Sequence, residues 1–346
     1  MHLATFVHIS DLHFGDINPT TGENTYDAMA PKIWANNSQF DGLLGHRYIA
    51  LKRLAEFFHS KHRDEGAQLI VTGDLTCVGK DEQFDTANEY LGALLQPPKG
   101  RCLGLAVGDW KDRAVPGNHD HWPGMSWMFG GPTPALGTHF PHLPFISPPI
   151  ALSTGQQLRF VGINTDADVW PYGRDRLLAR GVFHNQLHLA AGHMANLGLP
   201  CRNEICVLLL HHSHEWQGAT LRMTTASRQA LNTFIAEQSI AVLLCGHTHV
   251  PYVGSNSVTH QGSTIEFLEA RCGSTTQWDI IPYNWKTLWG TRPKRNLQAN
   301  TLIVHRLREE NREIKWRAET YQRKPHGFEK ATGPNLEDEL TVWSPP

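Results

Sequence analysis

An α/β fold is the architecture that the sequence predicts, and two observations support it. Five short apolar runs, each suited to a buried strand, end directly in polar residues, and segments with helical spacing lie between them. The runs are 6–9, 68–71, 113–115, 207–210 and 241–245. Ligands of open α/β sheets collect at the carboxyl ends of the strands. We therefore expect the polar residues after these runs to converge, although they are far apart in sequence.

The elements between the first two strands follow from composition and spacing. Residues 15–45 are rich in Asn, Thr, Gly and Pro and lack periodicity, which indicates an inserted loop overhanging the strand ends. Apolar residues three and four apart from Tyr48 to Phe58 predict a helix that covers the sheet. A second helix is expected over 81–95, ending before Pro97-Pro98.

A second insertion is predicted over 121–149, where Pro, Gly and aromatic residues are dense. Two interpretations stay open: the aromatic residues, Trp122 among them, wall a substrate pocket, or they pack onto the domain. A strand over 158–163 and a helix over 183–197 follow. Arg174, Arg176 and Arg180, between these two elements, form either a phosphate clamp or a solvated face.

The last part of the chain predicts three strands and a tail. Strands are expected at 264–268, 302–308 and 314–321, the last two joined as a hairpin. Residues 323–346 mix Lys, Pro, Gly and acidic residues with little apolar content, which favours a surface arm or a disordered tail. One main domain over 1–322 is the expected organisation.

Composition restricts the class of protein. Of 346 residues, 40% are hydrophobic and 18% are charged, which supports a substantial core and opposes global disorder. The net charge of -2 lacks the basic bias of most nucleic-acid binders, so a nucleic acid is not the favoured partner. No apolar stretch approaches the roughly 18 residues of a membrane span, so we expect no membrane partner and no signal peptide. Six cysteines without a CxxC pair indicate reduced thiols and a cytoplasmic protein.

The polar residues at the strand ends offer metal ligands. In chain order the motifs are Asp11-Leu12-His13, Gly73-Asp74, Gly117-Asn118-His119-Asp120, His211-His212 and Gly246-His247-Thr248-His249. Residues two apart in an extended chain point to the same side, which would bring together the members of each Asp-x-His or His-x-His pair. Carboxylate, amide and imidazole donors without thiolate suit two divalent ions drawn from Mn, Fe or Zn, with Co or Ni as alternatives. Two such ions roughly 3.5–4 Å apart neutralise a phosphate ester and lower the pKa of bound water.

The order of these motifs resembles that of the calcineurin-like metallophosphoesterases over roughly residues 3–322. The resemblance implies a four-layer α/β/β/α sandwich of two mixed sheets flanked by helices, forming a catalytic domain. It also implies that His119 contacts the scissile phosphate and protonates the leaving oxygen, helped by Asp120. The implied first metal is held by Asp11, His13, Asp74 and His249, and the second by Asp74, Asn118, His211 and His247, with Asp74 bridging.

Two departures from the family pattern narrow the expected function. Protein serine/threonine phosphatases carry a second Asp and an Arg where this chain has Cys77 and Val78, so phosphoprotein substrates are disfavoured. Gly73-Asp74-Leu75-Thr76 is more similar to the bacterial cyclic-nucleotide phosphodiesterases and DNA exonucleases. Where relatives often have His-His-Pro-Pro, this chain has His211-His212-Ser213-His214. His211 is the preferred ligand because it ends the strand, with His212 as the alternative, while His214 is either a pocket residue or an exposed loop residue.

The expected activity is hydrolysis of small phosphodiesters, such as cyclic nucleotides, through a metal-bridging hydroxide. Candidate substrate contacts are His212, His214, Arg174 and Trp122. A phosphomonoesterase, a nuclease, or a non-catalytic protein-interaction scaffold on the same fold are the alternatives.

Overall fold

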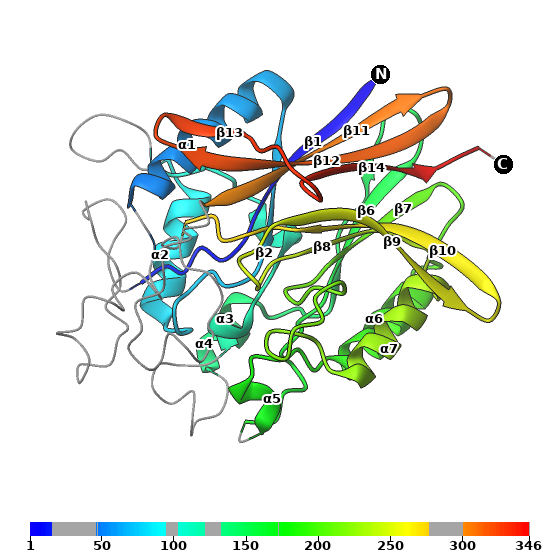
Figure 1. The fold of residues 1–346 in the computed structure, drawn as a ribbon, viewed down its shortest axis with the longest axis horizontal. Coiled ribbons are helices and arrows are strands. Elements are labelled where there is room, and N and C mark those ends of the chain that lie inside the picture. The colour runs from blue at the N-terminus through cyan, green and yellow to red at the C-terminus, as the bar shows by residue number, and fades with distance from the viewer. Residues whose placement is uncertain are drawn as a thin grey trace.

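Two mixed β-sheets pack face to face in the computed structural model, which describes residues 1–15, 46, 48–94, 103–121, 133–171, 173–276 and 300–345 (Figure 1). The first sheet holds β1 (His2–Ile9), β2 (Gln68–Thr72), β3 (Ala114–Val115), β11 (Thr301–Glu310), β12 (Glu313–Lys324), β13 (Gly327–Lys330) and β14 (Glu337–Trp343). The second sheet holds β4 (Phe145–Ile146), β5 (Ile150–Ala151), β6 (Gln157–Gly162), β7 (Glu204–Leu209), β8 (Ile240–Cys245), β9 (Tyr252–His260) and β10 (Ser263–Arg271).

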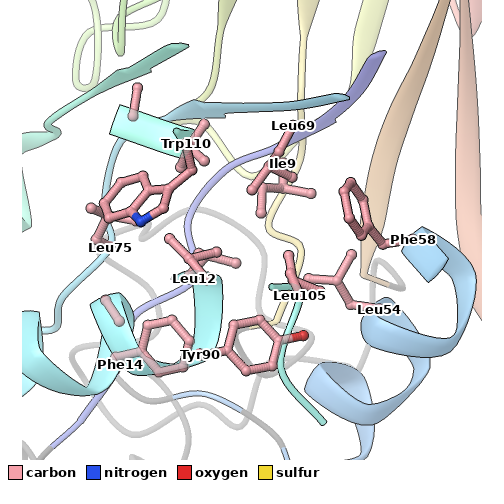
Figure 2. Close-up of a cluster of buried hydrophobic side chains, with 14 of the residues drawn as sticks. Ile9, Leu12, Phe14, Leu54, Phe58, Leu69, Leu75, Tyr90, Leu105 and Trp110 are labelled. Carbon is pink, nitrogen blue, oxygen red and sulfur yellow. The ribbon is translucent and has the colours of Figure 1, made fainter. Parts of the chain in front are cut away.

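Helices flank the two sheets. They are α1 (Tyr48–Glu65), α2 (Asp81–Gly92), the 3₁₀ helix η3 (Trp110–Arg113), α3 (Asn118–His121), α4 (Pro134–His139), α5 (Arg174–Leu177), α6 (His184–Asn196) and α7 (Thr225–Glu237). Figure 2 shows Leu54 and Phe58 of α1 beside Ile9 and Leu69 of the first sheet. Leu54 and Phe58 belong to the apolar face that was predicted for this helix. A second cluster joins α6 and α7 to the outer face of the second sheet.

A third buried cluster fills the space between the sheets. Phe6 of β1 stacks on Trp316 of β12, with ring centroids 5.9 Å apart, and meets Phe160 of β6 edge-on at 5.5 Å. Helix, sheet, sheet and helix therefore form four layers, as the family resemblance implied.

The sheet order places the carboxyl ends of the motif-bearing strands together. β1, β2 and β3 are parallel neighbours in the first sheet, and β6, β7 and β8 are parallel neighbours in the second. β1 lies between β2 and β11, so the first and the eleventh strands of the chain pair directly. The motifs of both sheets consequently meet at one edge of the sandwich.

The prediction of an arm or disordered tail after residue 323 is wrong. Residues 327–330 and 337–343 form β13 and β14, which pair with β12. Leu340, Val342 and Trp343 pack against the cluster between the sheets, and Trp343 Nε1 donates to the Arg202 carbonyl at 3.0 Å. An edge strand needs few apolar residues because it buries one face only, so the polar composition concealed it.

The two predicted insertions are described in part. Residues 16–45 lie outside the described residues, as do 122–132 of the second insertion. In the remainder of the second insertion, Phe140 packs against Phe84 of α2, and Phe145 packs on the cluster between the sheets. For these two residues the packing interpretation is correct. Among the described residues, no helix is long and apolar enough to cross a membrane.

Candidate metal centre

Three overlapping groups of acidic and histidine side chains gather at this edge of the sandwich. Within each group the potential ligand atoms all lie within 4.8 Å of one another. The groups are Asp11, His13 and His249; His13, Asp74 and His119; and Asp74, His211 and His247. Because His13 and Asp74 each belong to two groups, the three form one continuous cluster, with Asp74 in its middle.

The ligand-bearing segments are not extended, contrary to the expectation from two-residue spacing. Five candidate ligands have left-handed backbone conformations: Asp11 (φ 53°), His13 (φ 52°), Asp74 (φ 51°), His247 (φ 72°) and His249 (φ 58°). The strands end before these residues, and the chain turns sharply at each of them. Side chains reach the cluster by these turns, a conformation that costs a non-glycine residue roughly 1–2 kcal/mol.

Neighbouring segments hold the turns in place. Backbone bonds from Asp11 N to Gly73 O (3.0 Å) and from His13 N to Asp74 O (2.9 Å) tie the first motif to the second. On the other side, Ser274 Oγ donates to the Asp11 carbonyl at 3.1 Å, and Thr276 Oγ1 donates to the Leu12 carbonyl at 2.6 Å. The first motif is therefore clamped between the loop after β2 and the segment after β10.

Two glycines of the motifs lie so close to candidate ligands that there is no room for a Cβ atom. A Cβ at Gly117 would lie 2.7 Å from His211 Nε2 and would also overlap the Asp74 carboxylate. A Cβ at Gly246 would lie 2.8 Å from Asp11 Oδ2. Any larger residue would push against a candidate ligand.

In one half of the cluster, lone-pair atoms of Asp74, His211 and His247 point toward one another, as the ligands of a cation do. His211 Nδ1 lies 2.7 Å from the Thr72 carbonyl and His247 Nε2 lies 3.0 Å from the Ala179 carbonyl. Since a carbonyl only accepts, both nitrogens must carry the proton of a neutral ring. The remaining nitrogens, His211 Nε2 and His247 Nδ1, are then two lone pairs 3.1 Å apart, with Asp74 Oδ2 at 3.2 Å from the former. Three acceptors so close together are favourable only with a proton or a metal ion between them.

The other half of the cluster contains buried acceptors without hydrogen bonds. His13 Nε2 and Asn118 Oδ1 have no hydrogen-bond partner among the described residues. His13 Nε2 lies 3.9 Å from Asp11 Oδ1 and 3.8 Å from Asp74 Oδ2, while His249 Nε2 is 3.1 Å from Asp11 Oδ1. Buried polar atoms are rarely left without a partner, and an oxygen and nitrogen donor set fits a divalent metal ion. The residues present therefore fit two ions.

The charges in the cluster are coupled. Burial raises the pKa of Asp74, but the neighbouring His211 and His119 outweigh this effect and hold the pKa well below its usual value. Burial lowers the pKa of His211, and the Asp74 carboxylate more than reverses this shift. A proton on His211 and a bound metal ion would therefore compete for the same acceptors.

His119 and Asp120 stand at the end of β3 with different surroundings. His119 N donates to Asp74 Oδ1 at 2.8 Å, and the His119 ring places Nδ1 2.8 Å from the Cys77 carbonyl. The buried Asp120 carboxylate accepts from the backbone N–H groups of Leu75, Thr76 and Gly117 and from the Thr76 hydroxyl, at 2.8–3.1 Å. Asp120 thus fixes the two loops that carry Asp74 and His119.

Of the two adjacent histidines, His211 belongs to the cluster and His212 does not. His212 Nδ1 is bonded to Thr165 Oγ1 at 2.8 Å, and Nε2 lies 3.2 Å from the Ala179 carbonyl. Its ring packs on His247 with centroids 4.1 Å apart. Both ring nitrogens are occupied, so His212 buttresses a candidate ligand.

The other candidate substrate contacts lie outside the three groups or outside the described residues. His214 is half-buried and bonds Asn232 Oδ1 through Nε2 at 2.7 Å. Arg174 is exposed at the start of α5 and joins none of the groups. Trp122 lies outside the described residues.

Several residues that shape the centre were missed by the sequence reasoning. Thr72, Cys77 and Ala179 act through backbone carbonyls, which every residue has, so their side chains carry no signal. Glu269 is different, because an acidic residue within the otherwise apolar end of a strand, Phe267-Leu268-Glu269-Ala270, is itself an indication of a buried polar role.

Comparison with known proteins indicates the family of this chain. No curated protein matches the chain in sequence. Among solved structures, GAP50, the anchor in the inner membrane complex of Plasmodium, is similar with 13% identity and a TM-score of 0.49, covering 99% of this chain and 90% of that one. Vps29 of Chaetomium thermophilum has 8% identity and a TM-score of 0.36, with both chains covered fully at 100%. A Vps29 double mutant from Entamoeba histolytica has 9% identity and a TM-score of 0.32, covering 97% of this chain and 99% of that one. Residues 4–251, more than half of the chain, match the calcineurin-like phosphoesterases, and the protein belongs to that family.

Proposed function

We propose that this protein is a binuclear metal-dependent phosphodiesterase that acts on small phosphodiesters such as cyclic nucleotides. The observation that supports it most directly is the convergence of buried acceptors: His211 Nε2, His247 Nδ1 and Asp74 Oδ2 in one half of the cluster, and Asp11 Oδ1 and His13 Nε2 in the other. Such a concentration of lone pairs is unfavourable without cations.

Each half of the cluster supplies ligands for one ion. Asp11, His13 and His249 would hold the first with Asp74, and Asn118, His211 and His247 would hold the second with Asp74. Two bound divalent ions would supply charge neutralisation at the phosphate and a water of lowered pKa. The oxygen and nitrogen donors fit Mn, Fe or Zn, and Co or Ni as alternatives.

His119 is positioned to handle the proton of the leaving group. Its Nδ1–H donates to the Cys77 carbonyl, which leaves Nε2 as the nitrogen for proton transfer. His119 packs edge-on against His13, with ring centroids 4.7 Å apart, so it stands beside the ligands. The carbonyl of Cys77 therefore takes the orienting part that the second Asp plays in protein phosphatases.

The substrate proposal rests on what surrounds His119. Cys77 and Val78 stand where protein phosphatases carry an Asp and a phosphate-binding Arg, so an extra anchor for a dianionic monoester is missing from that motif. A phosphodiester carries one negative charge less and needs less such stabilisation. With a net charge of -2, a small diester is preferred to a long nucleic acid, and we propose a cytoplasmic site of action.

A panel of substrates and metals tests the proposal. Protein reconstituted with Mn, Fe or Zn should hold close to two ions per chain by elemental analysis. It should hydrolyse cyclic nucleotides and a bis-aryl phosphate at least tenfold faster than an aryl monophosphate or single-stranded DNA. Asp74→Asn should lose at least one ion and most of the activity, since it removes the shared carboxylate.

Distinct outcomes contradict distinct parts of this proposal. Two bound ions with no cleavage of any ester would refute the enzymatic function, while rates within tenfold across the panel would refute the preference for diesters. Well under two ions per chain would favour a non-catalytic scaffold.

A further inference from the structure

A buried carboxylate lies behind the loop that follows the candidate ligand His211. Glu269 belongs to β10, which pairs with β8 and β9 in the second sheet (Figure 1). Its side chain is fully buried, with a relative exposure of 0%. Burying a carboxylate without hydrogen-bond partners costs free energy, so the groups that bond to Glu269 indicate its role.

The Glu269 carboxylate captures the backbone of residues 213–215. Its Oε1 accepts from the Ser213 hydroxyl at 2.6 Å and from His214 N at 3.0 Å, and Glu215 N lies 3.2 and 3.1 Å from Oε1 and Oε2. Asn256 Nδ2 donates to Oε2 at 2.9 Å. A proline at 214 or 215 would offer no N–H, so this arrangement depends on the residues present here.

The Ser213 hydroxyl joins this carboxylate to a buried arginine. It donates to Glu269 and accepts from Arg271 Nη1 at 2.9 Å and from Trp216 N at 3.2 Å. One donor and two acceptor positions are the full capacity of a hydroxyl. Arg271 in turn bonds Glu215 Oε2 at 2.8 Å, and its guanidinium lies 5.3 Å from the ring centroid of Trp216. The loop is therefore held by a closed polar network.

This network and the strands fix His211 from both sides. Upstream, Leu210 N donates to the Leu244 carbonyl at 3.0 Å, and Gly246 N donates to the His211 carbonyl at 3.0 Å. Downstream, the Glu269 bonds begin two residues after His211. With its backbone held at both ends, the ring keeps Nδ1 on Thr72 and Nε2 toward Asp74.

We propose that Glu269 is a positioning residue for the second metal site, acting through Ser213, His214 and Glu215 to orient His211. The inference rests on the proposed binuclear site and does not depend on which ester is hydrolysed. Groups that orient a metal ligand typically affect metal affinity by about 10–100-fold.

The substitution Glu269→Gln tests this role with little change in volume. The amide keeps one acceptor oxygen, but its NH₂ would face the donors of Asn256 and Glu215, so the loop loses part of its anchor. Glu266→Gln is the matched control, because Glu266 is an exposed residue of the same strand. Ser213→Ala, which removes only the shared hydroxyl, is a second and milder variant.

Metal binding is measured by calorimetric titration of chelated protein with Mn²⁺ and with Zn²⁺, alongside thermal unfolding without metal. In Glu269→Gln one of the two binding events should lose affinity at least tenfold, and the other should change less than twofold. Ser213→Ala should show the same pattern with a smaller loss, and Glu266→Gln should match the parent. A merely structural role would lower the unfolding temperature without separating the two sites.

Equal loss at both sites, or no loss at either, would overturn the positioning role, as would a parent protein that binds fewer than two ions. A parent that binds two ions but hydrolyses no ester would refute the proposed enzymatic function, while the titrations would still decide the role of Glu269.

Discussion

Replacing Gly117 with alanine gives a direct measure of how tightly the centre is packed. The added Cβ would lie 2.2 Å from Asp74 Oδ1 and 2.7 Å from His211 Nε2, so it must move by about 1.2 Å and about 0.7 Å from these atoms to reach an ordinary contact of roughly 3.4 Å. Neither side yields easily, since Gly117 N donates to Asp120 Oδ2 at 2.9 Å and His211 Nδ1 is bonded to the Thr72 carbonyl at 2.7 Å. Overpacking of this kind costs about 1–3 kcal/mol, and loss of a bond to a charged group costs about 1.5–3 kcal/mol.

The free energy of unfolding of the Gly117→Ala protein should therefore be about 2.5–6 kcal/mol lower than that of the parent. This corresponds to a midpoint lower by roughly 5–12 °C, at about 2 °C per kcal/mol. Its metal affinity should fall by about tenfold or more, because metal–ligand distances tolerate only about 0.2 Å. The control is Gly192→Ala, the same change at an exposed position of α6 with nothing within 4 Å, which should stabilise by about 0.5–1 kcal/mol. Thermal unfolding and metal titration of both variants provide the measurement. If Gly117→Ala were as stable and bound metal as tightly as the parent, the close approach of these loops would be refuted.

Three further outcomes are expected. His119→Ala should keep both ions but lose about 10²–10⁴ in kcat for diesters with poor leaving groups, the range for removal of a general acid; loss of an ion would show that His119 is a ligand instead. Burial lowers the pKa of His8 to about 3 and that of His305 well below its usual value, so both are neutral in the fold. Their contribution to stability is present above the unfolded pKa of about 6.5 and is lost as pH falls below it, by about 1.4 kcal/mol per pH unit each. His305→Phe should therefore flatten the acid limb of the stability curve by about one proton, and an unchanged limb would contradict the assignment. Trp343→Ala should cost about 1–3 kcal/mol in urea unfolding, since it removes a packed aromatic ring and the bond to the Arg202 carbonyl; no change would mean that β14 contributes nothing to stability.

The sequence predicted which residues would meet, because a ligand must be a particular residue type. Asp11, Asp74 and His247 follow buried apolar runs, and strand polarity alone brings such positions to one edge. The preference for His211 over His212 as a ligand followed from the strand end; His211 lies in the cluster and His212 does not, and the ligand role stays a prediction. The types of these residues and their order along the chain were sufficient for these conclusions.

What the sequence did not predict was backbone conformation and the groups that act through it. The spacing in Asp11-Leu12-His13 predicted an extended chain, but Asp11 and His13 both have a left-handed backbone conformation. Backbone hydrogen bonds to Gly73 and Asp74 stabilise this conformation. The carbonyls of Thr72 and Ala179 orient two imidazoles. Every residue has a backbone carbonyl, so residue type gives no indication of this role. β14 was missed because only one of its faces is covered, so its apolar content is that of a tail.

The clamp on the first motif has a consequence for how the protein must be made. Residues 4–251 match the family, and every candidate ligand lies within them. Yet the hydroxyls that hold the carbonyls of Asp11 and Leu12 belong to Ser274 and Thr276, and the partner of β1 on its other side is β11, residues 301–310. In a nascent chain synthesised only as far as His249, β1 would lack its β11 partner and form an exposed edge of the sheet. Asp11 would then be held on one side only. Contacts of such long sequence separation are slow to form. The first motif is thus braced on both sides only after residues 274–310 have been synthesised, although every candidate ligand precedes them.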